Sequence, residues 1–386
     1  MNYASIGVKD AAELSAAIRK VLREVLLADD IYEFGLRGRI DPAAEGSPAA
    51  QFLAARAALR ERLSTQEMAG LVEPFDPDTY NRNATVAENL LFGTPVGEVF
   101  DMDNLGNHPY VRQILNESGL TEEFVGIGQQ VAEIMLDLFA DFDSSHDLME
   151  QFSFISPEDL PEFQAIISRL NRSDNGTAEA DRNRLMSLPF RLAPGRHRLG
   201  LIDENTQERL LAARKLFAQK LPDDLHGSIA FFDPEQFNPA SSLQDNLLFG
   251  KIAYGRPQAE QQVRAALGQV LRDFGLIQAT IDIGLEFQVG VAGARLSTVQ
   301  RQKLAIARAM LKQPDLLILN NPFGSFDESL RLAVLEGVME AQKGRGVLAV
   351  MDQLTLPERF DRVFVAKDGR LSEINDFKPS SAEAAE

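Results

Sequence analysis

Polar side chains follow a short apolar run in the last quarter of the chain, where they could bind or act on a ligand. Residues 316–319 (LLIL) predict a buried strand, and Asn320 and Asn321 follow it directly. A short loop then ends at Asp327. Because α/β folds bind ligands at the carboxyl ends of their strands, we expect a candidate site at Asn320 and Asn321.

A second feature lies just upstream of this strand. Residues 296–300 (LSTVQ) open a basic, Ala-rich segment that ends near Pro314. The segment predicts a helix with Ser297 at its start. A loop, a helix and a buried strand therefore follow one another here, and the helix must position the polar residues that come after the strand.

This order of elements resembles the nucleotide-binding domain of ATP-binding-cassette (ABC) transporters. In that family an LSGGQ signature opens a helix, a strand then ends in Asp-Glu, and a loop ends in Asp. The corresponding residues here are 296–300, Asn320 with Asn321, and Asp327, at the family's spacing. The resemblance covers about residues 188–373. It implies an α/β, ABC-ATPase-like fold of the P-loop NTPase class, with a mostly parallel sheet and a helical subdomain, preceded by a partial, helix-rich repeat.

The resemblance implies binding roles for Ser297 and Gln300 of the signature and for Asp327. In ABC dimers the signature of one domain contacts ATP that is held by the P-loop of its partner. The Ser297 hydroxyl and the helix N-terminus could make such a contact. Thr298 and Val299 replace two glycines of the motif, however, and their side chains would crowd a phosphate. The sequence therefore slightly favours Ser297 as a helix N-cap, with the contact in trans as the alternative.

The P-loop position of the family is changed. By the resemblance, residues 199–202 lead into it and a helix over residues 209–221 follows it. The residues that occupy or flank it are Glu204, Asn205, Thr206, Glu208 and Arg209. A P-loop reads GxxxxGK[ST], because glycines let backbone N–H groups wrap the phosphates while Lys and the hydroxyl meet the phosphates and Mg²⁺. Residues 203–208 contain no Gly or Lys but three acidic side chains, which would repel a triphosphate, and no GxxxxGK[ST] occurs elsewhere in the chain.

The family's catalytic positions are changed as well. The Asp that holds Mg²⁺ is Asn320 here, the Glu that orients the attacking water is Asn321, and the His is Asp352. Loss of a positioned general base alone costs about 10² to 10⁴ in rate. The chain by itself is therefore predicted to be inactive as an ATPase, with no intact catalytic residue and no metal site. ATP and Mg²⁺, which the family implies, would be bound only through a partner domain.

The chain also contains an internal repeat, which extends the resemblance to about residues 52–93. FDPDTYNRNATVAENLLFG begins at Phe75 and FDPEQFNPASSLQDNLLFG begins at Phe232, an offset of 157 residues. A Leu-Ala-Ala-Arg block precedes each copy, at residues 53–56 and 211–214. The tails resemble the ENILFG that follows the family's Q-loop, but Phe75 and Phe232 stand where its Gln would be. A Phe cannot hold Mg²⁺, so packed aromatic side chains are predicted there.

Composition excludes several other classes of protein. The chain has 39 Lys and Arg against 57 Asp and Glu, for a net charge of −18, so it lacks a large basic footprint for nucleic acid. It has no Cys, which excludes disulfides and thiolate metal sites, and its four His are scattered. No apolar run approaches the roughly 18–20 residues that span a bilayer, and charges interrupt residues 1–30. We expect a cytoplasmic location, peripheral to the inner or plasma membrane through a transporter.

Three domains are predicted along the chain. They are a partial or decayed first ABC-like unit with a helical region (residues 1–183), a degenerate nucleotide-binding domain (184–375) and a disordered acidic tail (376–386). One sheet is expected from residues 199–202, 229–232, 316–319, 347–351 and 363–366. Residues 316–319 should be central, and an edge position would count against the resemblance. Helices are expected over residues 9–28, 52–63, 209–221, 257–273 and 328–342 and through much of 110–173, with a possible strand over residues 31–40.

The leading functional hypothesis is a degenerate ATP-binding region of an exporter-like ABC transporter, either the carboxyl-terminal part of a longer ABC protein or its partner. It would act with a catalytically competent nucleotide-binding domain and with a transmembrane domain in the same or another chain. The alternative is a non-catalytic interaction or scaffold module on an ABC fold that binds no nucleotide. An active ATPase with a divergent site is disfavoured by the changed residues.

Overall fold

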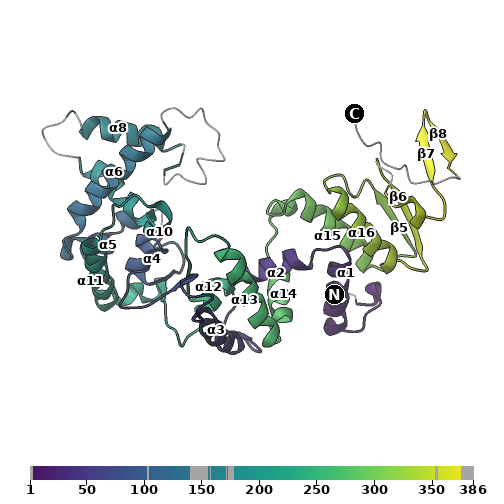
Figure 1. Cartoon of the computed structure of the whole chain (residues 1–386), viewed down its shortest axis with the longest axis horizontal. Coiled ribbons are helices and arrows are strands. Elements are labelled where there is room, and N and C mark those ends of the chain that lie inside the picture. The colour runs from purple at the N-terminus through teal and green to yellow at the C-terminus, as the bar shows by residue number, and fades with distance from the viewer. Residues whose placement is uncertain are drawn as a thin grey trace. The chain divides into compact units, whose positions relative to one another are not determined.

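The computed structural model describes residues 3–101, 104–139, 155–156, 158–170, 172, 178–352 and 355–374. The chain divides into two compact units (Figure 1). We call Leu36–Ala279 the central unit, and Met1–Gly35 together with Thr280–Glu386 the terminal unit. Both units are rich in helices, and the described residues form four two-stranded sheets.

The central unit is built mainly from helices around a core of Phe, Leu and Ile side chains, of which Phe124, Phe190 and Phe217 are fully buried. Its helices are α3 (Ala49–Leu63), α4 (Val86–Leu91), α5 (Pro109–Glu117), α6 (Thr121–Phe139), α8 (Leu160–Leu170), α9 (Glu179–Ser187), α10 (Pro194–His197), α11 (Glu204–Lys220), α12 (Leu243–Leu248) and α13 (Ala259–Asp273). Its strands are β1 (Val72–Pro74), β2 (Gly93–Pro95), β3 (Ile229–Phe231) and β4 (Gly250–Ile252).

The four short strands of the central unit pair between the two repeats rather than within them. β1, which precedes the first repeat's loop, pairs antiparallel with β4, which follows the second repeat's loop. β2 and β3 form the reciprocal antiparallel pair. A Cβ added at Gly93 or Gly250 would lie 2.7 or 2.4 Å from a carbonyl oxygen of the facing strand, so only glycine allows this approach. The repeats therefore exchange strands.

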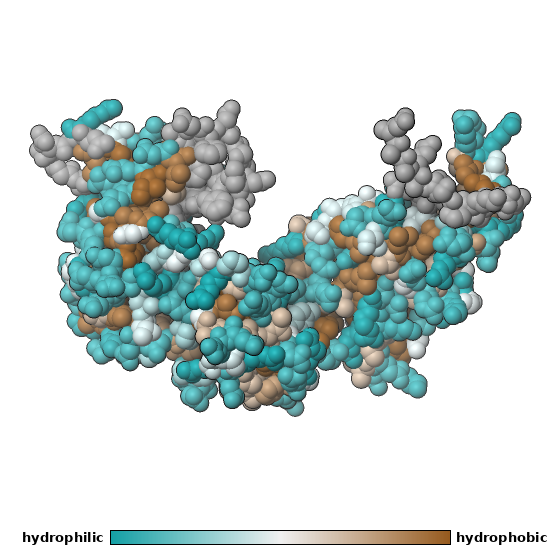
Figure 2. Space-filling view, in the orientation of Figure 1, coloured by the Kyte–Doolittle hydropathy of each residue, from teal (hydrophilic) through white to brown (hydrophobic). Residues whose placement is uncertain are grey.

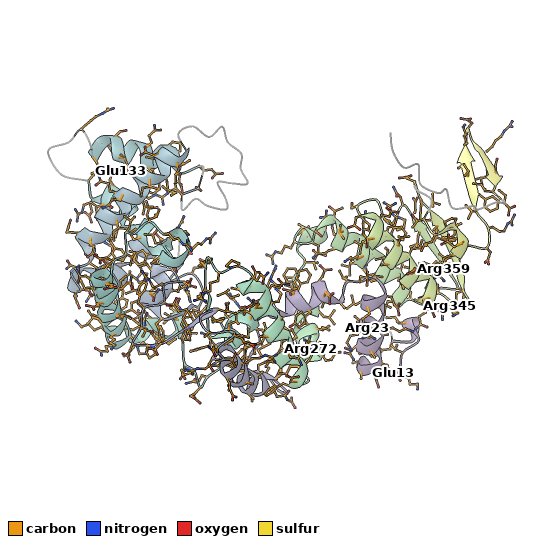
Figure 3. The ribbon with its side chains drawn as sticks, viewed as in Figure 1. Glu13, Arg23, Glu133, Arg272, Arg345 and Arg359 are labelled. Atoms are coloured by element: carbon orange, nitrogen blue, oxygen red, sulfur yellow. The ribbon has the colours of Figure 1, made fainter. Side chains whose placement is uncertain are left out.

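The terminal unit combines helices from both ends of the chain. They are α1 (Ala11–Glu24), α2 (Ala28–Arg37), α14 (Ile277–Leu285), α15 (Thr298–Leu311) and α16 (Glu328–Ala341), and α2 and α14 run across the unit boundary. Asp10 caps α1, whose first turn carries Glu13 and whose last turn carries Arg23 (Figure 3). These charges complement the helix dipole.

The sheets of the terminal unit are small. β5 (Leu316–Asn320) and β6 (Gly346–Val350) are parallel, and β7 (Phe364–Lys367) and β8 (Arg370–Glu373) form an antiparallel hairpin. Leu317 and Leu319 are buried against the helices, but the opposite face of β5 and β6 is exposed. Its side chains are Leu316, Ile318, Leu348 and Val350. Figure 2 shows hydrophobic residues that reach the surface in this part of the molecule.

The predicted single, mostly parallel sheet is wrong for the described residues. Residues 199–202 form no strand, residues 229–231 pair with β2, and residues 364–367 pair with β8. β5 keeps one parallel neighbour, β6, so it is not central. The apolar runs identified strand-forming segments correctly in most cases, but the nearest compatible backbone edge decided their partners.

The possible strand over residues 31–40 is also wrong, because residues 28–37 form α2. Ile31 and Phe34 are buried on one side of it at helical spacing, and Leu27, just before the helix, is buried as well. Within the described residues the other predicted helices are confirmed, with ends that differ by up to about five residues, and α1 ends at Glu24 rather than at residue 28. Residues 140–154 of the predicted helical region lie outside the described residues.

The compact units do not follow the expected boundary between residues 183 and 184, since they divide at residues 35/36 and 279/280. The predicted acidic tail (376–386) lies outside the described residues. Among the residues that the structure describes, no helix has the length and apolar character needed to cross a membrane.

Candidate functional site

The P-loop position lies at the start of α11 in the central unit, where the Asp203 side chain caps the helix. Asp203 is the helix N-cap, and its Oδ1 accepts hydrogen bonds from the Thr206 N–H and the Thr206 hydroxyl, both at 2.8 Å. The Thr206 N–H, and then the Thr206 hydroxyl, hold the pKa of the Asp203 carboxyl below its usual range. A carboxylate therefore occupies the N–H groups that a P-loop would offer to a phosphate.

Two other residues at this position are tied to α6. Glu123 accepts hydrogen bonds from the Thr206 hydroxyl and from the Arg209 guanidinium, which also donates to the Gly119 carbonyl. Thr206 is buried, whereas the remaining side chains are exposed. These exposed residues are Glu204, Asn205 and Glu208. The residues present do not fit a magnesium–triphosphate group, because they supply carboxylates where the phosphates would lie.

The signature position lies in the terminal unit, where Ser297 is the N-cap of α15. Its Oγ accepts the Gln300 N–H at 3.1 Å, and Gln300 Oε1 accepts the Ser297 N–H at 3.0 Å. This reciprocal pair is a capping box. Gln300 Nε2 also donates to Asp30 at 2.7 Å. The N-cap interpretation of Ser297 is confirmed, while its contact with another subunit stays a prediction.

The residues after β5 and β6 come together at the carboxyl end of the small parallel sheet. The Asn321 N–H donates to the Val350 carbonyl and its side-chain amide donates to Asp352, both at 2.8 Å. Asn320 is the exposed last residue of β5. Asn321 and Asp352 also line a cavity of about 100 Å³, and Asp327 caps α16. Asparagine amides do not act as general bases, so Asp352 is the member of this pair that could accept a proton from water.

The structure brings the family positions together only in part. Asn321 and Asp352 are hydrogen-bonded to one another, and Ser297 lies in the same unit. Residues 203–209 belong to the other compact unit. The described residues thus carry the P-loop position and the signature position as separate features.

Sequence reasoning missed two buried arginines of the central unit, each of which makes five hydrogen bonds. Arg56 on α3 donates to the Asn246 carbonyl at 2.6 Å and to Asn246 Oδ1 at 2.9 Å, in the second repeat. Arg214 on α11 donates to the Asn89 carbonyl at 2.7 Å and to Asn89 Oδ1 at 2.9 Å, in the first repeat. Each arginine therefore belongs to the helix before one repeat and binds the loop of the other. The repeated Leu-Ala-Ala-Arg block was the signal that could have identified them.

Each arginine also donates to three backbone carbonyls of the loop that it binds. Arg56 binds those of Asp233, Pro234 and Gln236, and Arg214 binds those of Asp76, Pro77 and Thr79. Burial lowers the pKa of both guanidinium groups to about 10, so both remain charged at neutral pH. Their hydrogen bonds offset the cost of burying the charge.

Four phenylalanines lie between the two arginines. Phe75 and Phe232 stack with ring centroids 4.1 Å apart, and Phe92 and Phe249 meet them edge to face. Arg214 lies 4.5 Å from the Phe92 ring centroid and Arg56 lies 5.0 Å from that of Phe249. The prediction that packed aromatic side chains occupy the Gln positions is confirmed.

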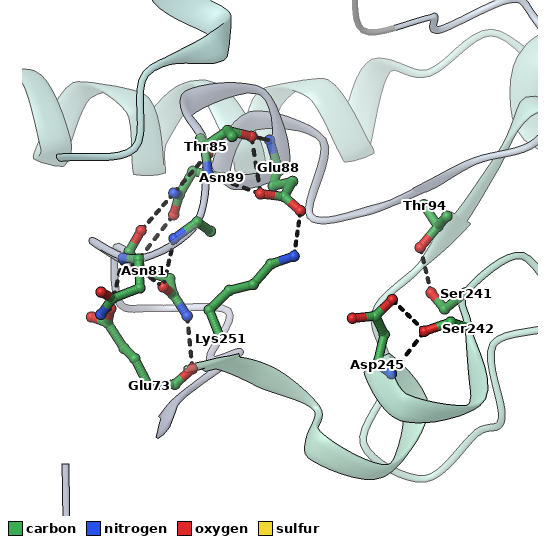
Figure 4. A network of polar contacts seen from close by, with 12 residues as sticks. Glu73, Asn81, Thr85, Glu88, Asn89, Thr94, Ser241, Ser242, Asp245 and Lys251 are labelled. Carbon is green, nitrogen blue, oxygen red and sulfur yellow. Dashed lines mark hydrogen bonds and ion pairs between the residues drawn. The ribbon is translucent and has the colours of Figure 1, made fainter. Parts of the chain in front are cut away.

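The loops share a polar network, part of which Figure 4 shows. The Asn81 N–H donates to Asn89 Oδ1 at 2.9 Å, and the Asn238 N–H donates to Asn246 Oδ1 at 2.8 Å. These asparagines therefore link the turn of each loop to its short helix and present the oxygen that the arginine binds.

The comparisons with known proteins agree with the sequence resemblance. Residues 165–324 match the family model described as "ABC transporter", over less than half of the chain. An ATP-dependent lipid A-core flippase of Xanthomonas euvesicatoria is 35% identical over 150 residues, which is 39% of this chain and 25% of that protein. The flippase of the same name from Chromobacterium violaceum is 38% identical over 134 residues, covering 34% of this chain and 22% of that protein.

A more distant relative is a probable multidrug resistance ABC transporter ATP-binding/permease protein, YheI, of Bacillus subtilis. It is 27% identical over 156 residues, covering 40% of this chain and 26% of that protein. The chain thus spans about a quarter of the length of these curated relatives. No solved structure matches the chain. The matches and the ordered motifs identify residues 165–324 as an exporter-like ABC transporter nucleotide-binding region.

Proposed function

We propose that this chain is a degenerate ATP-binding region of an exporter-like ABC transporter that does not hydrolyse ATP by itself. The observation that carries the proposal is the Asp203 carboxylate, which caps α11 where a P-loop would present its N–H groups. Asn320, Asn321 and Asp352, at the family's catalytic positions, support it. ATP and Mg²⁺ would be held by a partner domain.

The partner is a second nucleotide-binding domain with an intact P-loop, and a transmembrane domain in the same or another chain would carry the transported substrate. Ser297 and the N-terminus of α15 are the groups that this chain would offer to the partner's nucleotide. This assembly would place the chain on the cytoplasmic side of the inner or plasma membrane. Residues 1–183 would be a partial or decayed first unit of the same kind, as the repeat suggests.

A scaffold module that binds no nucleotide is the second candidate. It is favoured because residues at the family's nucleotide-binding positions bond to other parts of this chain. Glu123 binds Thr206 and Arg209, and Asp30 binds Gln300. In that case the surfaces of the ABC fold would bind other proteins, and the fold would bind no nucleotide.

Titration of the chain with MgATP in a calorimeter tests the loss of the nucleotide site. We expect no saturable binding in the micromolar range, because no Gly-rich loop is present and Asp203 caps the helix. Micromolar binding that Thr206→Val and Arg209→Gln abolish, and that the exposed control Arg264→Gln leaves intact, would contradict the proposal.

Mixing the chain with a P-loop-bearing nucleotide-binding domain separates the two candidates. Ser297→Ala and Ser242→Ala each remove a serine N-cap, from α15 and α12, so both should cost about 0.5–2 kcal/mol of stability. If Ser297 acts in trans, only Ser297→Ala should also lower the ATP turnover of the partner. Equal turnover with both variants would leave the scaffold candidate.

A further inference from the structure

An apolar cavity of about 240 Å³ lies within the terminal unit. α1, α2 and α15 supply most of its wall, with Val21, Ile31, Phe34, Leu304 and Ala307 among the side chains that line it. Protein interiors normally contain few voids larger than a water molecule. This cavity exceeds the roughly 150 Å³ apolar cavities that stay dry and bind benzene.

Close contacts fix the elements that surround the cavity against one another. Phe34 stacks on Phe287 with ring centroids 4.3 Å apart. A Cβ added at Gly284 would lie 1.9 Å from the Ile31 carbonyl oxygen, so the backbones of α14 and α2 touch there. Lys303 is buried and donates to the Leu26 carbonyl at 2.8 Å. The cavity is therefore preformed, as small-molecule sites usually are.

Only two of the lining residues have polar side chains, and they differ in what they can still bind. The Gln300 side chain already accepts the Ser297 N–H and donates to Asp30. Arg308, on α15, lines the cavity and is exposed to solvent. A guanidinium at the rim of an apolar cavity can bind a carboxylate with two parallel hydrogen bonds.

We propose that this cavity binds a single aliphatic chain of medium length that ends in a carboxylate. The chain enters between α1, α2 and α15, where each methylene leaves water for an apolar wall. Its carboxylate stays at the rim and pairs with Arg308. The volume suits one chain and excludes the two chains of a membrane phospholipid. The inference is independent of any nucleotide role.

The first test is titration of the whole chain with decanoate. Wild type should bind saturably, and Ala307→Leu, which fills the cavity, should weaken binding at least tenfold. Ala305→Leu adds the same volume at an exposed position of the same helix and should change binding less than twofold. Failure of wild type to bind, or equal binding by Ala307→Leu, would overturn the proposal.

The second test examines the head group and avoids any folding defect, because Arg308 is exposed. Arg308→Gln should weaken decanoate about fivefold or more and change the binding of uncharged 1-decanol less than twofold. Arg301→Gln, an exposed arginine of the same helix that bonds Thr298, serves as the control for lost charge. Equal losses for decanoate and 1-decanol would overturn the assignment of Arg308. Binding to phosphatidylglycerol vesicles without binding of decanoate would also overturn it, in favour of a membrane contact.

Discussion

The loop of the first repeat (residues 75–93) and that of the second (232–250) have the same internal architecture but different surroundings. In each, a short helix ends at a left-handed phenylalanine, Phe92 or Phe249, with φ of 45° and 42°. In each, an arginine from the helix before the other repeat binds the loop. In both loops the arginine contact joins one repeat to the other. These contacts between repeats therefore stabilise the central unit.

The differences lie around this shared core. An ion pair between Glu88 and Lys251, 2.7 Å apart, holds helix α4 of the first loop. Thr94 is the residue equivalent to Lys251, and its hydroxyl contacts that of Ser241 in the second loop at 2.5 Å. α11 is anchored to α6 through Glu123. Arg56 and Arg214, which we call the arginine clamps, therefore bind equivalent groups in both repeats. The supporting contacts, in contrast, are specific to one repeat.

Replacement of Arg214 or Arg56 should have the largest effect on the free energy of unfolding. Arg214→Ala removes five hydrogen bonds to carbonyl-type acceptors, of which Asn89 Oδ1 keeps the Asn81 N–H as a donor. We therefore expect a loss of about 3–5 kcal/mol in the free energy of unfolding, measured with urea. Arg56→Ala should cost the same within about 1 kcal/mol, because its contacts are equivalent. The exposed control Arg264→Ala should cost at most about 0.5 kcal/mol. A loss below about 1 kcal/mol at either clamp would break the equivalence of the repeats.

Glu123→Ala should have the next largest effect, because it frees both Thr206 and Arg209 from α6. We expect a loss of about 2 kcal/mol in unfolding free energy. The neighbouring Glu122 pairs with Arg182 at the surface, so Glu122→Ala should cost much less than Glu123→Ala. Equal losses for the two variants would show that the anchor of α11 has no special weight.

Lys251→Met tests the ion pair that supports only the first loop. Burial opposes the charge of Lys251, but Glu88 outweighs it and raises the pKa of Lys251 above its usual range. Loss of this partly buried pair should cost about 1 kcal/mol. Thr94→Val, at the equivalent position, should cost about half as much. Chemical denaturation of both variants decides whether the first loop is the better supported one.

The smallest expected effect is a pH dependence at α10, which adjoins the first loop through the hydrogen bond from the Gly195 N–H to the Arg82 carbonyl. Burial, and then Arg196, lower the pKa of His197 to about 4. Between pH 6.5 and 4 the unfolded chain binds a proton that the folded chain does not, so stability should fall on acidification. After allowance for partial exposure, we expect about 0.5–1 kcal/mol. His197→Gln should flatten this slope in thermal unfolding, and an unchanged slope would contradict the assignment to His197.

The local elements and the residue types at the family positions could be predicted from the sequence alone. Helix starts followed from capping residues such as Ser297, and strand segments such as β5 followed from short apolar runs, because both signals act between near neighbours in the chain. The repeated block at residues 53–56 and 211–214 also marked two equivalent helices.

Only the tertiary structure decided which distant segments pair. A strand of three residues, such as β1 or β3, offers few hydrogen bonds, so it takes its partner from whichever edge the surrounding helices place beside it. The arginine clamps decide that here, because Arg56 and Arg214 satisfy the loop carbonyls of the opposite repeat. The same long-range packing put residues 203–209 and Ser297 in different units. No local pattern specifies such an exchange, because swapped and unswapped pairings bury the same residues along the chain.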